Sequence, residues 1–343
     1  MNNPLAKIIL RIVAVSLFAA IPMIVRAQPS LPEPPSRVYG VSKKDPLPVL
    51  APMTGGDTSE KSVTVDKNVN LSLCVTQGTV KVNGWNRNEL RVFVNDGSNF
   101  SYRVLQRNAK TNDPVWLMIV GAEEKGKVAP PGECLRGGEI EIDAPVGSTI
   151  NIKGRETTTT VDLVKRLNIS TIGGNISARN ISNGITANAN QGDITVEESE
   201  GGMILDTTTG NILVFNAGPS EIGDTFRAKT NSGAISLQKV LHRQIEANSV
   251  SGSVAYNGDI LSGGSYSLTT SKGSISLSLN ANISCRISAT YGFGNFRSEI
   301  PIDTETDNIS PGPIKTIVGK LGEGGEASIK LSTNNGSIVI KKL

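Results

Sequence analysis

The sequence predicts an all-β protein built as a parallel β-solenoid, a single-chain β-helix that we expect to be right-handed. Glycine recurs about every 20 residues through the second half of the chain, a period typical of solenoid repeats. Short stretches of alternating apolar and polar residues flank these glycines, as in β-strands. The chain has 36 glycines and only 4% aromatic residues. This composition suits many short strands with tight corners around a core of small side chains.

Residues 1–27 are interpreted as a signal peptide rather than as part of the fold. Basic residues precede an apolar run over residues 12–25, and the small residue Ala27 closes it, which predicts cleavage before Gln28. The alternative is an anchor that stays in the membrane. Against it, Pro22 interrupts the run, which is shorter than the roughly 20 residues of a membrane span. We therefore expect an exported protein, periplasmic or extracellular at the cell surface, with no transmembrane anchor after cleavage.

Loss of this segment changes the charge balance of the protein. The whole chain has 34 basic and 31 acidic residues, and Lys7, Arg11 and Arg26 leave with the signal peptide. The mature chain then has 31 of each and is formally neutral. This balance gives no reason to expect a basic surface for nucleic acid or anionic lipid. We therefore expect no nucleic acid among the partners.

Residues 28–60 form a proline-rich linker. Such a segment favours extended polyproline conformation and acts as a semi-rigid tether, and a disordered tail is the alternative. Residues 61–343 are predicted to form the solenoid. Its opening section, residues 61–145, alternates in the β manner but less regularly than the repeats in residues 146–343. We expect the opening section to cover the first rung, because an uncovered rung is an exposed sheet edge.

The repeat is clearest in the stretch LDTTTGNILV around Gly210. The alternation puts Leu205, Thr207 and Thr209 inward before the glycine, and Ile212 inward after it. The inward parity therefore shifts by one residue at the glycine. Glycine permits such a tight corner without steric cost. A polar substitution at Ile212 is accordingly expected to disrupt the core.

The same pattern holds in eight copies of the repeat. The corner glycines are Gly174, Gly192, Gly210, Gly233, Gly252, Gly273, Gly294 and Gly336. Two residues after the corners lie Ile176, Ile194, Ile212, Ile235, Val254, Ile275, Phe296 and Ile338. Three residues before the corners lie Thr171, Ala189, Thr207, Thr230, Ser249, Thr270, Tyr291 and Thr333. The interval before the last glycine is about two periods, which predicts one missing or inserted corner.

The two ends of the solenoid need protection against end-to-end growth. We expect SIVIKKL to be the final strand, with Lys341 and Lys342 opposing the stacking of another copy. The segment from Asp303 to Gly325 is long enough to fold over this end. We therefore expect a monomer.

Three stretches give the chain a family resemblance: GTVKVNGWNRNELRV, IEIDAPVGSTINI and the C-terminal IKLSTNNGSIVIKKL. With the serial glycine corners, they resemble the bacterial putative-adhesin family, also called the toast-rack domain, over residues 61–343. The resemblance implies a parallel β-solenoid that is exported or membrane-associated and has no catalytic signature. It also implies a link to envelope-stress signalling, because some relatives are parts of such proteins.

The three cysteines predict one pair and one remaining thiol in an exported protein. Cys285 shares the inward parity of Ile287 and is expected to be buried. Cys74 and Cys134 both lie in the opening section, and a disulfide between them is one of two open interpretations. The other interpretation is that both remain free thiols.

The outward positions beside the corners are small and polar and form two sets. One set is Asn175, Ser177, Asp193, Thr195, Asn211, Ser236, Ser253, Ser274, Ser276, Asn295 and Ser337. The other is Ser170, Asn188, Asn190, Asp206, Thr208, Lys229, Asn231, Asn248, Thr269, Ser271, Ser332 and Asn334. Flat arrays of hydroxyls and amides suit the binding of a glycan or a partner surface. The alternative is that they only keep the sheet soluble.

Groups for catalysis are sparse, and we expect no catalytic, cofactor or metal site. His242 is the only histidine and is expected to be solvated. Glu197, Glu198 and Glu200 are expected to lie on a solvated turn, with weak calcium binding as the alternative. A glycan-cleaving enzyme would need carboxylates gathered on one face, and Asp193 and Asp206 fall in different columns.

The sequence therefore favours an exported, non-catalytic, adhesin-like interaction module rather than an enzyme. Its partner is an unknown protein or glycan of the cell envelope or surface. The alternatives are an envelope-stress signalling scaffold for membrane proteins and, third, a glycan-active β-helix enzyme.

Overall fold

The computed structural model describes residues 58–97, 99–121, 134–280, 282–308 and 313–343. The predicted signal peptide and nearly all of the proline-rich linker lie outside the described residues. Residues Thr54–Leu343 form one compact unit, distinct from Met1–Met53. The described residues contain 25 strands and no helix, and most neighbouring strands pair in parallel. The predicted all-β, parallel β-solenoid is therefore confirmed.

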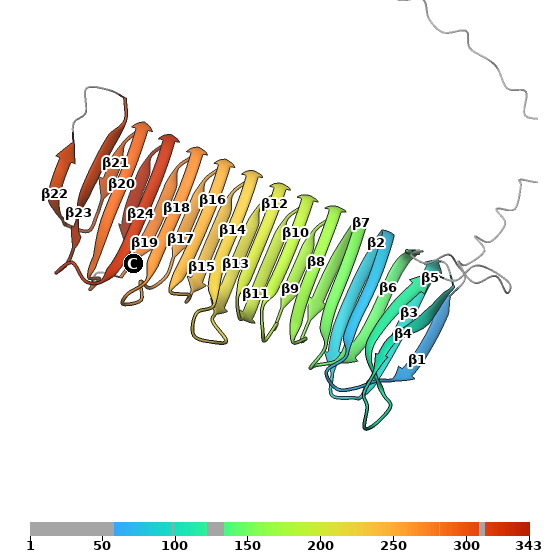
Figure 1. Ribbon diagram of the computed structural model, residues 1–343. Helices are drawn as coiled ribbons and strands as arrows, with labels where there is room; N and C mark the ends of the chain where they lie inside the picture. Colours follow the sequence, from blue (N-terminus) through green and yellow to red (C-terminus); the bar gives the residue numbers. More distant parts are fainter. Residues whose placement is uncertain (1–57, 98, 122–133, 281, 309–312) are drawn as a thin grey trace, which may run out of the picture. The chain divides into compact units, whose positions relative to one another are not determined.

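The strands form one continuous sheet that bends at corners into two layers around a common core (Figure 1). In spatial order, the A layer contains β4 (Phe100–Arg107), β5 (Pro114–Gly121), the first halves of β2 (Asn70–Trp85) and β7 (Thr149–Asp162), β8 (Arg166–Gly173), β10 (Ile185–Gln191), β12 (Met203–Thr209), β14 (Thr225–Ser232), β16 (Gln244–Ser251), β18 (Ser265–Lys272), β24 (Ala327–Asn335), β20 (Cys285–Phe293), β23 (Lys315–Leu321) and β22 (Ile302–Asn308). The B layer contains β1 (Ser59–Thr64), β3 (Glu89–Gly97), β6 (Leu135–Pro145), the second halves of β2 and β7, β9 (Ile176–Arg179), β11 (Ile194–Glu200), β13 (Ile212–Gly218), β15 (Ile235–Val240), β17 (Val254–Asn257), β19 (Ile275–Leu279), β25 (Ile338–Lys342) and β21 (Phe296–Ser298).

Each rung of the repeat consists of one A-layer strand and the B-layer strand that follows it. Ile212 stacks directly between Ile194 and Ile235 of the neighbouring rungs and is fully buried. Leu205 and Thr207 also point inward, as predicted, but Thr209 is exposed. The strand therefore leaves the strict alternation just before the corner, which the sequence pattern did not reveal.

Glycine is required at the first corner because consecutive rungs approach each other there through their backbones. A Cβ atom built on Gly210 would lie 2.0 Å from the carbonyl oxygen of Gly192 in the preceding rung. A Cβ on Gly233 would lie 1.9 Å from the carbonyl oxygen of Gly210. Gly294 makes the same approach to Gly336, at 2.0 Å, without a left-handed φ. Close backbone approach is thus the shared reason for the glycine column.

Backbone hydrogen bonds continue through this corner except at the peptide unit after the glycine, where side chains are the partners. The Thr230 hydroxyl donates a hydrogen bond to the carbonyl of Gly210 in the preceding rung, at 3.0 Å. Equivalent bonds run from Thr207 to Gly192, from Ser249 to Gly233, from Thr270 to Gly252 and from Thr333 to Gly273. These hydroxyls explain the column of threonine and serine three residues before the glycine. They satisfy a carbonyl that would otherwise lie unpaired inside the fold.

The residue after the glycine has a matching role toward the backbone amide. Asn175 Oδ1 accepts a hydrogen bond from the amide of Asp193 at 2.9 Å, and Asp193 Oδ1 accepts one from the amide of Asn211 at 2.7 Å. Asn211 Oδ1 in turn accepts from the amide of Ala234 at 2.9 Å. The polar residues beside the corner therefore hold successive rungs together.

The second corner of the rung uses a left-handed residue that is not glycine. Asn180, Glu198, Asn216 and Lys239 occupy this position in consecutive rungs, with φ between 45° and 54°. Leu163 takes the same conformation in the preceding rung, with φ 59°. Asparagine tolerates this region better than leucine, glutamate or lysine. The sequence gives no uniform residue type here, and the corner was not predicted.

The first rungs of the solenoid are not in chain order. β2 lies between β5 and β6 on one side and β7 on the other, parallel to all three. Beyond β5 and β6 the outer strands β4 and β3 run antiparallel, and β1 pairs antiparallel with β3. Antiparallel strands thus end the parallel stack, and the opening section covers the first parallel rung.

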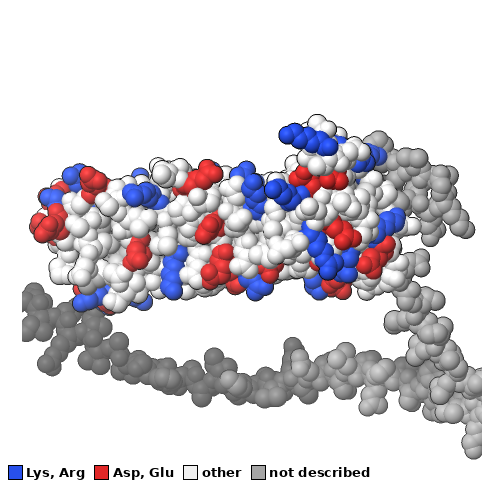
Figure 2. Space-filling model, turned by 90° about the horizontal axis from the view of Figure 1, so that it is seen from below, with Lys and Arg blue, Asp and Glu red and all other residues white. Residues whose placement is uncertain are grey.

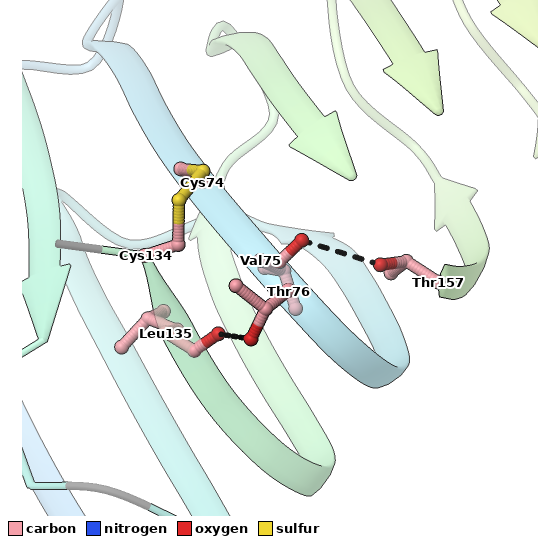
Figure 3. The surroundings of a disulfide bond; sticks show 6 residues. All are labelled: Cys74, Val75, Thr76, Cys134, Leu135 and Thr157. Atoms are coloured by element: carbon pink, nitrogen blue, oxygen red, sulfur yellow. Dashed lines mark hydrogen bonds between the residues drawn. A yellow bond between two sulfur atoms is a disulfide. The ribbon is translucent and has the colours of Figure 1, made fainter. Parts of the chain in front are cut away.

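A disulfide bond joins Cys74 of β2 to Cys134, just before β6, with 4.5 Å between the Cα atoms. The two half-cystines are 60 residues apart in the sequence. Figure 3 shows two further links at this corner, from Thr76 Oγ1 to Leu135 O at 3.1 Å and from Thr157 Oγ1 to Val75 O at 3.5 Å. On the chain-entropy model, closing such a loop stabilises the fold by about 4 kcal/mol.

The last rungs are also out of chain order, and the predicted end of the solenoid is wrong. β24 lies between β18 and β20, and β25 lies between β19 and β21 (Figure 1). SIVIKKL is therefore an interior rung, and Lys341 and Lys342 do not guard an edge. The long interval before Gly336 contains β22 and β23, which stand where the sequence predicted a missing or replaced corner.

A hairpin covers the A layer at this end. β23 pairs antiparallel with β20, and β22 pairs antiparallel with β23. Ile302 and Ile317 of the hairpin pack against the core, and Leu321 is fully buried. Much of the segment 303–325 therefore lies at the terminal rung, as expected. Cys285, which starts β20, is a buried free thiol, and burial raises its pKa to about 11.

Replacing Gly210 by alanine should destabilise the fold by about 2–4 kcal/mol, because the new methyl group would collide with the Gly192 carbonyl. Gly218→Ala is the matched control, since a Cβ there meets no atom within 4 Å. The free energy of unfolding from denaturant titrations compares the two variants. Equal losses would contradict the close-approach explanation.

Thr230→Val should cost about 1–3 kcal/mol, because the Gly210 carbonyl loses its partner while the side-chain volume is kept. The reverse change is available at Ala189, which occupies the same column beside Gly174 and has no hydroxyl. Ala189→Thr should therefore raise the melting temperature. If Thr230→Val raised the melting temperature in the same thermal scans, the hydrogen bond to the Gly210 carbonyl could not be the reason for threonine at this position.

Replacing residues 302–321 by a short glycine–serine linker should expose the edge of β20 and produce concentration-dependent oligomers. Lys341→Ser with Lys342→Ser is the control and should leave the association state unchanged, because β25 is an interior strand. Light scattering over a concentration series measures both. If the lysine variant formed oligomers and the linker variant did not, Lys341 and Lys342 would be the residues that oppose stacking, as the sequence predicted.

Candidate binding face

The outer surfaces of the two layers differ in how their polar residues are used. In the B layer, Asn175, Asp193, Asn211, Ser274 and Ser337 accept hydrogen bonds from backbone amides at the corner. These members of the first predicted outward set are therefore part of the rung-to-rung ladder. In the A layer, the residues of the second set stand in straight columns on the outer side of the sheet. The A layer is thus the better candidate for binding.

A hollow of about 490 Å³ lies on the A layer over β8, β10, β12 and β14. We call it the A-face hollow. It is lined by Ser170, Thr171, Ile172, Asn188, Ala189, Asn190, Asp206, Thr207, Thr208, Arg227, Lys229 and Asn231. Seven of these residues belong to the second predicted outward set. The sequence missed Ile172 and Arg227.

The hollow arises from a change in side-chain length along the columns. Ser170, Asn188 and Asn190 are short, whereas Arg227 and Lys229 on β14 are long. The long cations therefore stand at one side of a shallow floor of amides and hydroxyls. Ile172, with 55% of its surface exposed, adds an apolar contact on the other side.

The charge of the hollow comes from three side chains. Asp206 Oδ2 lies 3.5 Å from Arg227 Nη2. Lys229 is the register partner of Asp206, but no carboxylate of the described residues forms an ion pair with it. Asp206 Oδ1 is buried and has no hydrogen-bond partner among the described residues. One carboxylate thus faces two cations, which leaves a positive site.

Basic residues also prevail over the rest of this surface. The exposed basic residues on the parallel A-layer strands from β7 to β20 are Lys153, Arg155, Arg166, Arg227, Lys229, Lys272, Arg286 and Lys330. The acidic residues on these strands are Glu156, Asp206 and Glu246. Apart from Arg227–Asp206, the ion pairs of the described residues lie on B-layer strands or in the β22–β23 hairpin. The nearly equal numbers of basic and acidic residues in the sequence, 34 and 31, therefore conceal an uneven distribution of charge.

Figure 2 shows one side of the molecule, with charged side chains scattered among uncharged ones along the stack. Charges of both signs are densest toward the right, where the N-terminal strands lie. The B-layer ion pairs of this region include Arg91–Asp143, at 2.8 Å, and Lys81–Glu139. Such paired charges at the surface leave little net potential for a ligand.

The glutamate cluster is not on a turn, as predicted, but in a strand. Glu197, Glu198 and Glu200 belong to β11, and Glu198 occupies the left-handed second corner. Its Oε1 accepts a hydrogen bond from Asn216 Nδ2 of the next rung, at 2.5 Å. In the described part of the chain, no three His, Cys, Asp or Glu side chains are placed to hold a metal ion together.

His242 is buried, and its predicted exposure to solvent is wrong. The ring lies in the turn between β15 and β16 and is fully covered. Nε2 donates a hydrogen bond to the carbonyl of Gly201 at 2.8 Å, and Phe226 packs 5.6 Å away between ring centroids. Nδ1 has no partner among the described residues. The connection packs against Gly201 of an earlier rung. A single histidine between Leu241 and Arg243 gives no sign of this contact in the sequence.

Burial lowers the pKa of His242 from its usual value of 6.5. The bond to Gly201 and the negative charge of Asp224 act in the opposite direction and are weaker. The ring is therefore held in its neutral form and has no place in proton transfer with a ligand of the A-face hollow, whose lining does not include it.

Comparisons with known proteins show similarity only at the level of solved structures. No family model matches the chain, and no curated protein does. A putative cell adhesion protein from Clostridium sporogenes is 13% identical, with 84% of this chain and 100% of that chain covered and a TM-score of 0.24. A putative adhesin from Bacteroides fragilis is 14% identical, with coverages of 83% and 97% and a TM-score of 0.36.

A third solved structure is a putative lipid binding protein from Parabacteroides distasonis. It is 14% identical, with 84% of this chain and 98% of that chain covered and a TM-score of 0.32. The first two names agree with the family resemblance in the sequence. Identities and scores this low carry no functional argument. Among the described residues, no helix has the length and apolar character of a membrane span.

Stability should fall as the pH drops below about 6.5, because the unfolded chain takes up a proton on His242 more readily than the folded one. The contribution is fully present above pH 6.5 and is lost toward the lower pKa of the folded state. Since this is the only histidine, His242→Gln should abolish the slope between about pH 5 and 7. Urea titrations across this range test it, and an unchanged slope in the variant would contradict it.

Proposed function

We propose that this chain is an exported, non-catalytic interaction module, adhesin-like, that binds a cell-envelope or cell-surface partner through its A layer. The observation that carries the proposal is the A-face hollow, a concave and polar site on a sheet held rigid by its neighbours on both sides. Few conformational degrees of freedom are lost when a ligand meets such a surface, which favours binding.

The lining of the hollow supports binding rather than catalysis. Asp206 is the one carboxylate among the lining residues, whereas glycoside hydrolysis uses a pair. Asp206 also forms an ion pair with Arg227 and has no second acid in the hollow to complete a pair of carboxylates. The enzyme alternative therefore lacks its chemistry at this site.

Export is supported by the N-terminal sequence and by the disulfide. The basic residues, apolar run and Ala27 of the leader have the order of a secretory signal. A disulfide such as Cys74–Cys134 persists in oxidising compartments and is rare in the cytosol. We place the mature chain in the periplasm or at the cell surface, as a monomer.

Filling the hollow should abolish binding to isolated envelope fragments. Asn231→Trp places a large ring at the hollow, and Gln238→Trp places the same ring on the B layer of the same rung, at an equally exposed position. The purified mature chain is sedimented with envelope fragments. Its intact mass should be that of a chain beginning at Gln28. We expect a loss of at least about tenfold for Asn231→Trp and none for Gln238→Trp.

Equal binding of the two variants and the natural chain would contradict a role for the A layer. Loss of binding in Gln238→Trp alone would move the site to the B layer. Binding that depends on a membrane protein in the fragments would support the envelope-signalling scaffold instead.

A further inference from the structure

We propose that the A-face hollow binds an anionic glycan through a carboxylate, with Arg227 and Lys229 as the groups that hold it. This inference rests on the proposed function and names the chemistry of its ligand. It is carried by the charge of the hollow, the spacing of the two cations and the character of the surrounding side chains.

The two cations are placed to act together. They lie two residues apart on β14, so both side chains project from the same face of the sheet, roughly 7 Å apart along the strand. Both residues are exposed. A guanidinium and an ammonium at this spacing can donate to the two oxygens of one carboxylate held between them.

The neighbouring acid limits how much negative charge the hollow accepts. Asp206 Oδ2 lies 3.5 Å from Arg227 and offsets part of its charge, whereas Lys229 has no acidic partner among the described residues. With one acid against two bases among its lining residues, the hollow has a net charge close to a single positive unit. Glu246 of β16, the register partner of Arg227, lies outside this lining. A carboxylate carries one negative charge and matches this net charge better than a phosphate monoester, which carries nearly two.

The remaining lining suits the neutral part of a sugar ring. The amides of Asn188 and Asn190 and the hydroxyl of Thr208 offer both donors and acceptors for hydroxyl groups. The exposed side chain of Ile172, on β8 and three strands from β14, offers an apolar surface for the C–H face of a neighbouring sugar unit of the same glycan. A volume of about 490 Å³ is in the range of small-ligand sites.

The same features disfavour a lipid surface as the occupant. A flat bilayer would meet the tips of side chains over the whole A face, where the cations outside the hollow are spread along the stack on β7, β8, β18, β24 and β20. It would gain little from amides on the floor of a hollow. Nucleic acid would need an extended run of phosphate contacts, and the hollow offers two cations.

Isothermal titration of the mature chain with oligogalacturonate, a uronic acid oligomer, tests the proposal. Its methyl ester is the matched neutral probe. We expect the acid to bind at least about tenfold more tightly than the ester, and the preference to weaken as salt is added. The Lys229→Gln variant should bind the acid at least about tenfold more weakly. Its melting temperature checks the fold and should stay unchanged, because Lys229 forms no ion pair among the described residues.

A second pair of variants separates a built site from diffuse charge. Arg227→Gln with Lys229→Gln should abolish binding of the acid. Lys330→Gln with Arg286→Gln removes the same charge from the A face outside the hollow and should change the affinity by less than about twofold. Equal losses in the two double variants would overturn the proposal, as would equal binding of acid and ester.

Two further outcomes bear on the ligand. Binding to vesicles containing phosphatidylglycerol, lost in Lys229→Gln, without binding of the oligomer would overturn the glycan assignment in favour of lipid phosphate. If Asn231→Trp abolishes envelope binding while the oligomer does not bind, the proposed function stands and the carboxylate assignment fails. If neither the envelope nor the oligomer binds, both fail.

Discussion

The close approach of backbone at the glycine corner is the constraint on which the rest of the solenoid depends. A methyl group at Gly210 or Gly233 would lie about 2 Å from a carbonyl oxygen of the preceding rung, so the rungs stack at their normal spacing only without a side chain there. Backbone bonds run through the corner except at the peptide unit after the glycine, whose carbonyl and amide have side-chain partners. Thr230 donates a hydrogen bond to the Gly210 carbonyl, and Asn211 Oδ1 accepts one from the Ala234 amide. One steric requirement thus selects three residue types in most repeats, with Ala189, Tyr291 and Ala234 as exceptions.

A stack made in this way has two open ends, and the chain closes both by departing from its own order. The rung of β2 is inserted behind β5 and β6, and the rung of β24 and β25 is inserted behind β20 and β21. The strands left outermost in the A layer, β4 and β22, run antiparallel to their neighbours. A copy of the parallel repeat therefore finds no parallel edge to extend on this layer, which opposes assembly into fibres. The disulfide fixes the inserted strand at the first of these ends.

The two layers are left with different surfaces because their polar residues have different duties. In the B layer, the side chains of Asn175, Asp193 and Asn211 accept hydrogen bonds from backbone amides of the next rung. In the A layer, Asn188 and Asn190 stand free of such bonds beside cations that have few acidic partners. A regular scaffold thereby presents one irregular and positively charged hollow. This asymmetry makes the A layer the candidate binding face, although the sequence has nearly equal numbers of basic and acidic residues, 34 and 31.

Local pattern was sufficient to predict most of the fold and part of the candidate site. The parity of Leu205, Thr207 and Ile212 about Gly210 determines which side chains enter the core, because side-chain direction in a strand depends only on nearby residues. The polar column of Ser170, Asn188 and Asp206 followed from the same parity. Pairing between distant strands decided the order of the rungs at both ends and the burial of His242, and the stacking of four rungs placed Ile172 and Arg227 on opposite sides of one hollow. These depend on which segments far apart in the chain become neighbours, and a repeat in which every rung can stack on every other does not encode that choice in its local sequence.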